Sequence, residues 1–188
     1  MDKLDSTLGD RIIFHGDLPI AWTVVDHEPP ASKLFALNEN NARLLRLFTV
    51  LDEHLAEQFE SNQEVHQAFT RLDTKLTLVL ELVGEILSHQ LELPLPSRLA
   101  LSEQGIQWIE SSSSPLPEQI QLAYVSFYLK PELPRPLTFL AQMKAERHND
   151  GKVQFVAKFH GVNEEVQDGL AKLIFRQHRR MIASKRSS

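Results

Sequence analysis

The chain of 188 residues contains no cysteine, which excludes disulfides, thiolate metal sites and cysteine nucleophiles. No apolar run approaches the roughly 20 residues that a membrane-spanning helix needs. The first ten residues are acidic and polar, which is wrong for a signal peptide. These absences predict a soluble, cytoplasmic protein without a membrane span.

Sequence motifs for catalysis and for nucleotide binding are missing as well. The chain has no G-x-S-x-G, G-x-x-x-x-G-K, H-E-x-x-H or G-x-G-x-x-G motif. Its eight histidines never fall at the i, i+2 or i, i+4 spacing of a local metal pair. We therefore expect no enzyme activity, no catalytic residue, no metal site and no cofactor.

The net charge of -5 gives no overall basic field that would attract nucleic acid. Residues 39–92 carry ten acids and four bases, whereas the segment from Asn163 onward carries six lysines or arginines and three acids. The basic end could contact phosphate or an acidic partner. The simpler interpretation is a helix end whose cations suit the helix dipole, and no nucleic-acid partner is expected.

Proline and glycine are almost absent from the middle of the chain, where residues 38–90 contain no proline and a single glycine, Gly84. Apolar residues recur there at alternating steps of four and three, which predicts helices that bury one stripe against other helices. We predict that the seam in the second half of this segment is the oligomer interface. Its residues are Asn62, Val65, Phe69, Leu72, Leu76, Val79, Val83 and Ile86.

Two arrangements of this helical segment are possible. One unbroken helix would be roughly 80 Å long at about 1.5 Å per residue, and its ends could not return to one compact domain. The capping box Ser61-Asn62-Gln63-Glu64 would instead start a second helix. We favour a hairpin of helices near residues 39–59 and 62–91, with Asn38 as the first N-cap, over a single rod.

The stripe is too broad for one short hairpin to cover. β-Branched residues at one seam position disfavour parallel dimers and favour four helices, so the sequence predicts a homo-oligomer, most simply a tetramer. The first helix would pack its stripe, which includes Leu44, Leu47, Phe48, Leu51 and Leu55, against the outside of that bundle. A bundle formed within one subunit is the alternative.

Strand-like sequence flanks the helices on both sides. Residues 11–14 and 20–25 are short β-forming runs separated by a predicted turn at Gly16-Asp17, and residues 31–37 are read as a connection. Further predicted strands cover residues 98–101, 105–109, 120–129, 137–145 and 153–159, and Asn149-Asp150-Gly151 is a predicted hairpin turn. Strands at this spacing predict a small antiparallel barrel. An amphipathic helix that begins near Asn163 is expected to close one mouth of this barrel.

This order of elements resembles the PilZ domain, a bacterial receptor for cyclic di-GMP. The segment Ala100-Leu101-Ser102-Glu103-Gln104-Gly105-Ile106 is similar to that family's D/N-x-S-x-x-G turn, and the resemblance covers about residues 98–181 with residues 11–25 supplying the first strands. The helical hairpin would be an insertion, as in a PilZ subtype that forms tetramers through a coiled coil.

The resemblance also implies where a ligand would bind. The family contacts cyclic di-GMP through an R-x-x-x-R segment and through this turn. Ser102 and Gly105 match the turn, but Ala100 stands where an acid or amide is expected, and Arg11 has only His15 four residues later. Imidazole lacks the bidentate guanidinium fork. We therefore expect cyclic di-GMP binding to be weak or absent.

Together these features predict an α+β protein with a small PilZ-like barrel, a C-terminal helix and an inserted helical hairpin that forms an oligomeric coiled coil. The expected parts are residues 1–37, 38–93 and 94–188. The expected function is a non-enzymatic signalling adaptor that acts through protein partners, and the resemblance to the PilZ family implies a setting in bacterial motility or virulence regulation. The alternative is a genuine cyclic di-GMP receptor that uses a non-standard site.

Overall fold

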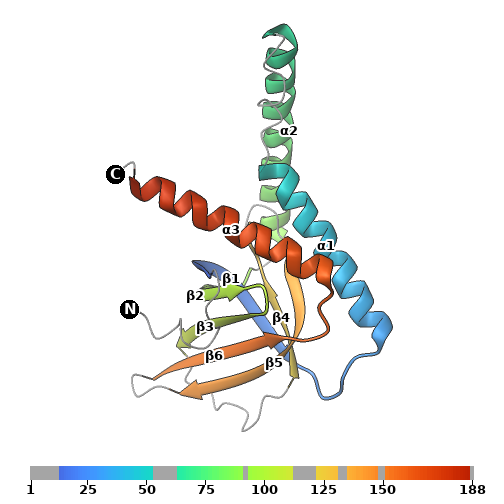
Figure 1. The fold of residues 1–188 in the computed structure, drawn as a ribbon, viewed down its shortest axis with the longest axis vertical. Helices are drawn as coiled ribbons and strands as arrows, with labels where there is room; N and C mark the ends of the chain where they lie inside the picture. The colour runs from blue at the N-terminus through green and yellow to red at the C-terminus, as the bar shows by residue number, and fades with distance from the viewer. Residues whose placement is uncertain are drawn as a thin grey trace.

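The computed structural model describes residues 13–52, 63–90, 93–111, 122–130, 135–147 and 151–186. Over these residues the chain is an α+β protein in which antiparallel strands close into a barrel, which confirms the predicted fold class (Figure 1). The elements in chain order are β1 Phe14–Val24, α1 Ala31–Asp52, α2 Gln63–Gln90, β2 Pro96–Ser102, β3 Gly105–Ser111, β4 Leu122–Phe127, β5 Leu137–Arg147, β6 Lys152–Phe159 and α3 Glu164–Arg186.

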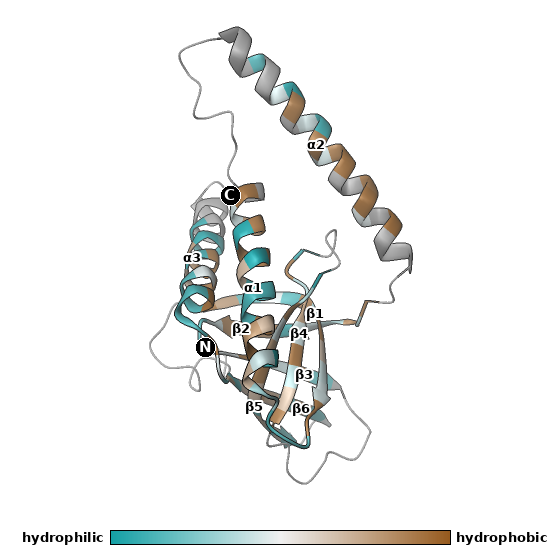
Figure 2. Ribbon diagram, turned by 90° about the vertical axis from the view of Figure 1, so that its right-hand side faces the viewer, coloured by the Kyte–Doolittle hydropathy of each residue, from teal (hydrophilic) through white to brown (hydrophobic). Residues whose placement is uncertain are grey.

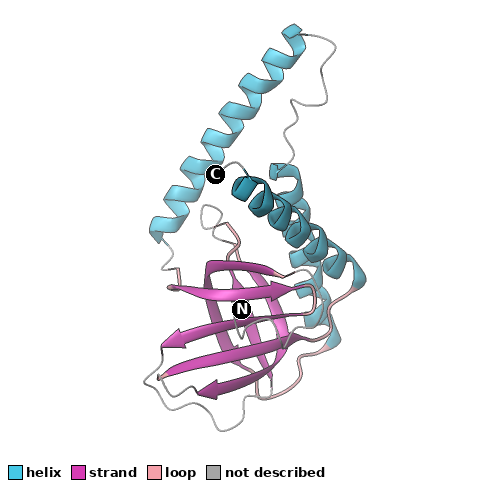
Figure 3. Cartoon of the chain, turned by 60° about the vertical axis from the view of Figure 1, so that its left-hand side comes forward, coloured by secondary structure: helices cyan, strands magenta, loops and turns pink. Residues whose placement is uncertain are grey.

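The barrel has the strand order β1-β2-β3-β6-β5-β4, and β1 closes it by pairing with β2 through its first half and with β4 through its second half (Figure 3). Alternate residues of each strand point inward and form an aromatic-rich core. Trp108 stacks on Phe155 with ring centroids 5.0 Å apart, and both side chains are almost fully buried. This core holds the surface positions of the barrel in a fixed register.

Strand β1 corrects one prediction, because it continues through Gly16-Asp17 without a turn. Gly16 pairs with Leu99, and a Cβ atom at this position would lie 2.6 Å from the ring of Phe14. The glycine is therefore explained by the close approach of an aromatic ring within an extended strand, and the sequence interpretation mistook it for a turn residue.

Helix α1 begins at Ala31, seven residues before the predicted N-cap. The carbonyl of Pro30 accepts the first hydrogen bonds, from the N–H groups of Lys33 and Leu34. Asn38 lies inside the helix, where its amide donates to the carbonyl of Gly161 and accepts from the N–H of Asn163. The predictions of a connection over residues 31–37 and of an N-cap at Asn38 were therefore wrong.

Part of the predicted apolar stripe of α1 is covered within the subunit, whereas Leu47 is 40% exposed and the side chains of Leu51 and Leu55 lie outside the described part of the structure. Leu44, Leu45 and Phe48 are 6%, 3% and 1% exposed and belong to the same core cluster as the barrel residues. The prediction that this stripe packs on the outside of a coiled coil was wrong for Leu44 and Phe48. The reason is that the outer face of β5 and one side of α3 provide an apolar surface within the same chain.

Polar contacts fix α1 against its neighbours. The buried amide of Asn41 donates to the carbonyl of Thr138 at 2.8 Å and accepts from the Thr138 N–H at 3.0 Å, so it pairs both backbone groups of this residue of β5. Arg46 contacts one carboxylate oxygen of Glu165 through two guanidinium nitrogens, at 3.0 and 2.6 Å. Helices α1 and α3 consequently cross at one end of the barrel (Figure 1).

Helix α3 begins at Glu164, as predicted within one residue, and Asn163 caps it by accepting from the N–H of Val166. Its predicted face is buried at Val166, Leu170 and Ile174. Strand β4 covers residues 122–127, and the remainder of the predicted strand over residues 120–129 is either not a strand or lies outside the described residues.

Helix α2 projects away from the barrel, and one side of it carries apolar residues (Figure 2). The predicted break between the two helices, including Ser61 and Asn62, lies outside the described residues. The bounds of α2, Gln63–Gln90, are close to those predicted for the second helix, residues 62–91. Helix α1, Ala31–Asp52, begins earlier than the first predicted helix, residues 39–59.

Candidate functional site

The β2–β3 turn carries the residues that resemble a ligand-binding motif. Ser102 is the last residue of β2 and is 0% exposed. Its hydroxyl donates to the carbonyl of Gly105 at 3.2 Å and accepts from the N–H of Gln104 at 3.3 Å. Since a serine hydroxyl has a single proton to donate, this side chain has no donor left for a phosphate or a guanine edge unless the turn opens.

Gly105 has a packing role in the barrel. It pairs with Lys158 on β6, and a Cβ atom at this position would lie 2.6 Å from the carbonyl oxygen of Ala157. The Gln104 carbonyl accepts from the N–H of Phe159 at 2.8 Å, which fastens the turn to β6. Close strand packing therefore accounts for a glycine at this position of the motif.

Ala100 and His15 are Cα partners across β1 and β2, so the structure brings these two predicted positions together. Ala100 is 0% exposed, and its methyl group offers no hydrogen bond where the motif expects an acid or amide. His15 is exposed and already has an interaction within the chain. Arg11 lies outside the described residues, so its relation to this pair stays a prediction.

Register identifies polar neighbours that the sequence interpretation missed. Ala100 pairs with Gln107 on β3, and directly paired residues project from the same face of a sheet. Gln107 is 0% exposed and accepts at 3.2 Å from the side chain of Gln154. Arg98, two residues before Ala100 on the same face, is exposed and has a partner within the chain. Strand alternation counted from the Ser102–Gly105 turn could have indicated both residues.

The arrangement at this face provides one guanidinium, one imidazole and two amides that bond to each other, around a methyl group. Among the described residues there is no cluster of histidine, aspartate or glutamate that could hold a metal ion.

Helix α2 carries the predicted interface. Of the eight predicted residues, Leu72, Leu76, Val79, Val83 and Ile86 are between 46% and 60% exposed. Leu78 and Leu82 widen the exposed stripe, at 53% and 58%. Asn62 and the side chains of Val65 and Phe69 lie outside the described part of the structure, so their role stays a prediction.

The size of this exposed stripe can be expressed as free energy. Complete burial of an aliphatic side chain contributes roughly 1.5–3 kcal/mol. Covering the exposed half of these seven side chains would therefore contribute on the order of 7 kcal/mol per subunit. One neighbouring helix would cover only part of the width, whereas each helix of a four-helix bundle contacts two others.

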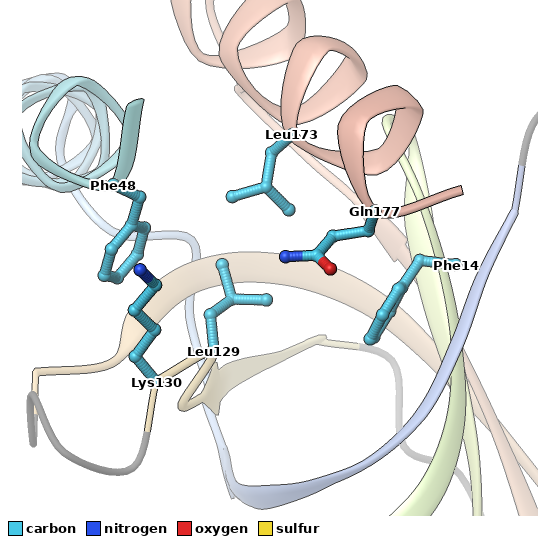
Figure 4. A pocket seen from close by; sticks show the side chains of 6 residues that line it. All are labelled: Phe14, Phe48, Leu129, Lys130, Leu173 and Gln177. Carbon is cyan, nitrogen blue, oxygen red and sulfur yellow. The ribbon is translucent and has the colours of Figure 1, made fainter. Parts of the chain in front are cut away.

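A small cavity lies at the end of the barrel between α1 and α3, and its lining residue Phe14 pairs with Leu101, the neighbour of Ser102. Its volume is about 120 Å³. Figure 4 shows its side chains converging from four parts of the chain. They are Phe14 of β1, Phe48 of α1, Leu129 and Lys130 after β4, and Leu173 and Gln177 of α3.

No helix in the described part of the structure is both long enough and apolar enough to cross a membrane.

Comparison with protein-family models gives a match over most of the chain. The model is described as an atypical PilZ domain, cyclic di-GMP receptor, and it matches residues 44–187. This range includes the last part of α1, the whole of α2, of β2 to β6 and of α3, but it omits β1. No curated protein matches the chain significantly.

Comparison with solved structures gives a neighbour over nearly the whole chain. It is a pathogenic protein from Xanthomonas campestris, described as a new tetrameric PilZ domain self-assembled via an unusual helical bundle. The TM-score is 0.66 at 22% sequence identity, and the alignment covers 93% of this chain and 92% of that one. At this identity the likeness establishes the fold alone.

Proposed function

The chain belongs to the atypical PilZ domain family, and we propose that it is a non-enzymatic, self-associating signalling adaptor with weak or no cyclic di-GMP binding at the β2–β3 turn. It would act through other signalling proteins. The proposal includes a cytoplasmic location, which was expected from the sequence, and a role in bacterial motility or virulence regulation, which the family resemblance implies.

The observation that carries the proposal is the state of Ser102. Its hydroxyl is buried and bonded to the backbone of its own turn, and Ala100 beside it offers only a methyl group. Each charge-assisted hydrogen bond that is missing costs roughly 1.5–3 kcal/mol. Two such losses lower the affinity by about two to four orders of magnitude.

The exposed stripe of α2 supports the self-association. Large exposed apolar patches on a subunit commonly mark interaction surfaces, and the similar Xanthomonas protein is described as assembling through a helical bundle. We propose a tetramer in which four copies of α2 cover one another, with Leu72, Leu76, Val79, Val83 and Ile86 at the centre.

Two measurements on the purified full chain test this function. Sedimentation equilibrium at micromolar concentration should give about four times the subunit mass of 21.5 kDa. Isothermal titration with cyclic di-GMP should give no micromolar binding. A monomer would refute the assembly, and a dissociation constant at or below the micromolar range would refute the weak-binding part.

A second candidate function is a genuine cyclic di-GMP receptor with a non-standard site. Two observations favour it. The matching family model is described as a receptor, and Arg98 places a guanidinium on the face that carries Ala100. If titration shows binding, Arg98→Ala should weaken it by about tenfold or more through loss of a charged contact. Arg135→Ala, an exposed arginine before β5, is the matched control and should have no effect.

A further inference from the structure

We propose that the outer face of α3 binds the surface of an anionic lipid bilayer, on which the protein lies without crossing it. The contact surface is a stripe that contains Lys172, Phe175 and Arg179. This inference goes beyond the proposed function, because it uses neither the β2–β3 turn nor α2.

Cations and large apolar residues alternate along one side of α3. They are Lys172, Phe175, Arg179, Ile182 and Arg186, which follow one another at steps of three, four, three and four residues. Such steps keep residues on one face of an α-helix. The segment 172–186 contains six lysines or arginines and no acid. The stripe is therefore basic throughout and is about 20 Å long at about 1.5 Å per residue.

The described part of the stripe faces solvent. Phe175 is 48% exposed, and Lys172 and Arg179 on either side of it are exposed as well. The guanidinium of Arg179 lies 5.9 Å from the centroid of the Phe175 ring, which is within the range of a cation–π contact. Among the residues that the structure describes, Lys172 and Arg179 have no carboxylate partner. The side chains of Ile182 and Arg186 lie outside the described part, and their place in the stripe follows from helical spacing alone.

The helix dipole does not account for these cations. Its effect falls off within the last turn of a helix, whereas Lys172 and Arg179 lie fourteen and seven residues before Arg186, the residue that ends α3. The dipole also gives no reason for a half-exposed phenylalanine between two cations. A surface that binds both charge and apolar groups accounts for both features.

The combination of charge and apolar surface favours a bilayer among anionic partners. Helices that lie in a membrane interface carry lysine and arginine together with phenylalanine or leucine, which enter the boundary between headgroups and acyl chains. A nucleic-acid backbone would bind the cations, but it offers no apolar medium to Phe175 and Ile182. A second copy of the stripe would bring like charges together.

The packing of α3 argues against a protein groove. A groove that receives an amphipathic helix binds its apolar face. In α3 this face is already buried, because Val166, Leu170 and Ile174 belong to the core cluster beneath the helix. Helix α3 lies across one end of the barrel, against α1, β1 and β2 (Figure 1). Only its outer stripe remains for binding, which suits a flat surface.

Vesicle flotation with the full chain tests the inference. The probe is vesicles of phosphatidylcholine and phosphatidylglycerol in roughly equal amounts, and the control is vesicles of phosphatidylcholine alone. We expect the protein to float with the mixed vesicles and to remain unbound with the control vesicles. Binding should weaken as the salt concentration rises, because the cations act through charge.

A charge reversal connects binding to the stripe. Each lysine or arginine near an anionic bilayer raises the affinity by about fivefold. Lys172→Glu combined with Arg179→Glu should therefore weaken vesicle binding by about a hundredfold or more. The matched control is Lys144→Glu combined with Lys158→Glu, at exposed lysines of β5 and β6. It makes the same change in net charge and should leave binding within about threefold, because charges away from the contact are screened.

A second pair of variants tests the apolar contribution. Phe175→Ser should weaken vesicle binding by about tenfold, through loss of an aromatic ring from the acyl boundary. Phe35→Ser is the control, because Phe35 is an exposed aromatic residue of α1, at 67%. It should leave binding within about twofold. Neither ring is in the core, so this pair keeps the test informative if the charge reversal unfolds.

Several results would overturn the inference. They are no flotation with the mixed vesicles, equal binding to phosphatidylcholine alone, and binding that survives both the charge reversal and Phe175→Ser. Tighter binding to a duplex oligonucleotide than to vesicles, unchanged by Phe175→Ser, would assign the stripe to nucleic acid instead. Sedimentation and the cyclic di-GMP titration depend on other parts of the chain, so failure of this inference is distinguishable from failure of the proposed function.

Discussion

Substitution of Leu76 by aspartate should dissociate the oligomer while leaving the subunit folded. Leu76 lies in the middle of α2 and is 52% exposed in the isolated subunit, so the barrel core does not depend on it. In a bundle the substitution forfeits about 1 kcal/mol of apolar burial per subunit. It also desolvates a carboxylate, and burying an uncompensated polar group costs roughly 2–7 kcal/mol even before its charge is counted. Across four subunits the penalty is on the order of 10 kcal/mol or more.

Sedimentation velocity over a micromolar concentration series measures the result. The variant should sediment as a monomer, with the near-ultraviolet circular dichroism of the buried Trp108 unchanged because the barrel is intact. Thr77→Asp is the matched control. Thr77 is exposed on the same helix and lies about 100° away from Leu76 around the helix axis. The carboxylate introduced by Thr77→Asp should therefore remain in solvent, and the oligomer should persist. An unchanged mass for Leu76→Asp, or equal dissociation by both variants, would refute the assigned interface.

Two further predictions concern the barrel. Asn41→Ala should lower the free energy of unfolding by about 2–4 kcal/mol, because it leaves the N–H and C=O of Thr138 unpaired. Urea denaturation measures this change. The control is Asn40→Ala at the exposed neighbouring position, which should change the free energy of unfolding by less than about 0.5 kcal/mol. Gly105→Ala should destabilise the fold by about 1–3 kcal/mol, since its Cβ would meet the Ala157 carbonyl oxygen at 2.6 Å; an unchanged melting temperature would contradict the packing role of this glycine.

Much of the barrel could be predicted from the sequence because its elements have local signals. The paired strands around the Ser102–Gly105 turn, the two alternating strands before and after Gly151, and the start of α3 were predicted within a few residues. Each prediction rests on side-chain alternation or on turn chemistry, which depend on neighbours in the chain.

The beginning of α1 and the path of β1 were not predictable in the same way. Gly16 reads as a turn residue unless the ring of Phe14 is known to fold over it, and Asn38 reads as an N-cap unless Gly161 and Asn163 are known to lie beside it. Both signals are ambiguous locally, because glycine and asparagine serve several structural purposes. Contacts between residues distant in sequence decide which purpose applies.

The candidate ligand site shows the same division. Its motif positions Ala100, Ser102 and Gly105 could be found from the sequence and could be seen to depart from the family pattern. Whether Ser102 keeps a free hydroxyl could not be known, because that depends on the closed geometry of its turn. The neighbouring Gln107 and Arg98 became evident only through the register of β1, β2 and β3.

The sequence by itself determined that this chain carries two apolar helical stripes beside a small antiparallel barrel, because periodicity of 3.6 or 2 residues is a local property of the chain. Tertiary structure alone decided that the stripe of α1 is covered by β5 and α3 while the stripe of α2 remains exposed. The two stripes look equivalent in sequence, and what distinguishes them is which apolar surface the closed barrel presents to each. The same packing of α1 against α3 created the cavity at Phe48 and Leu173, which no pattern in the sequence could have located.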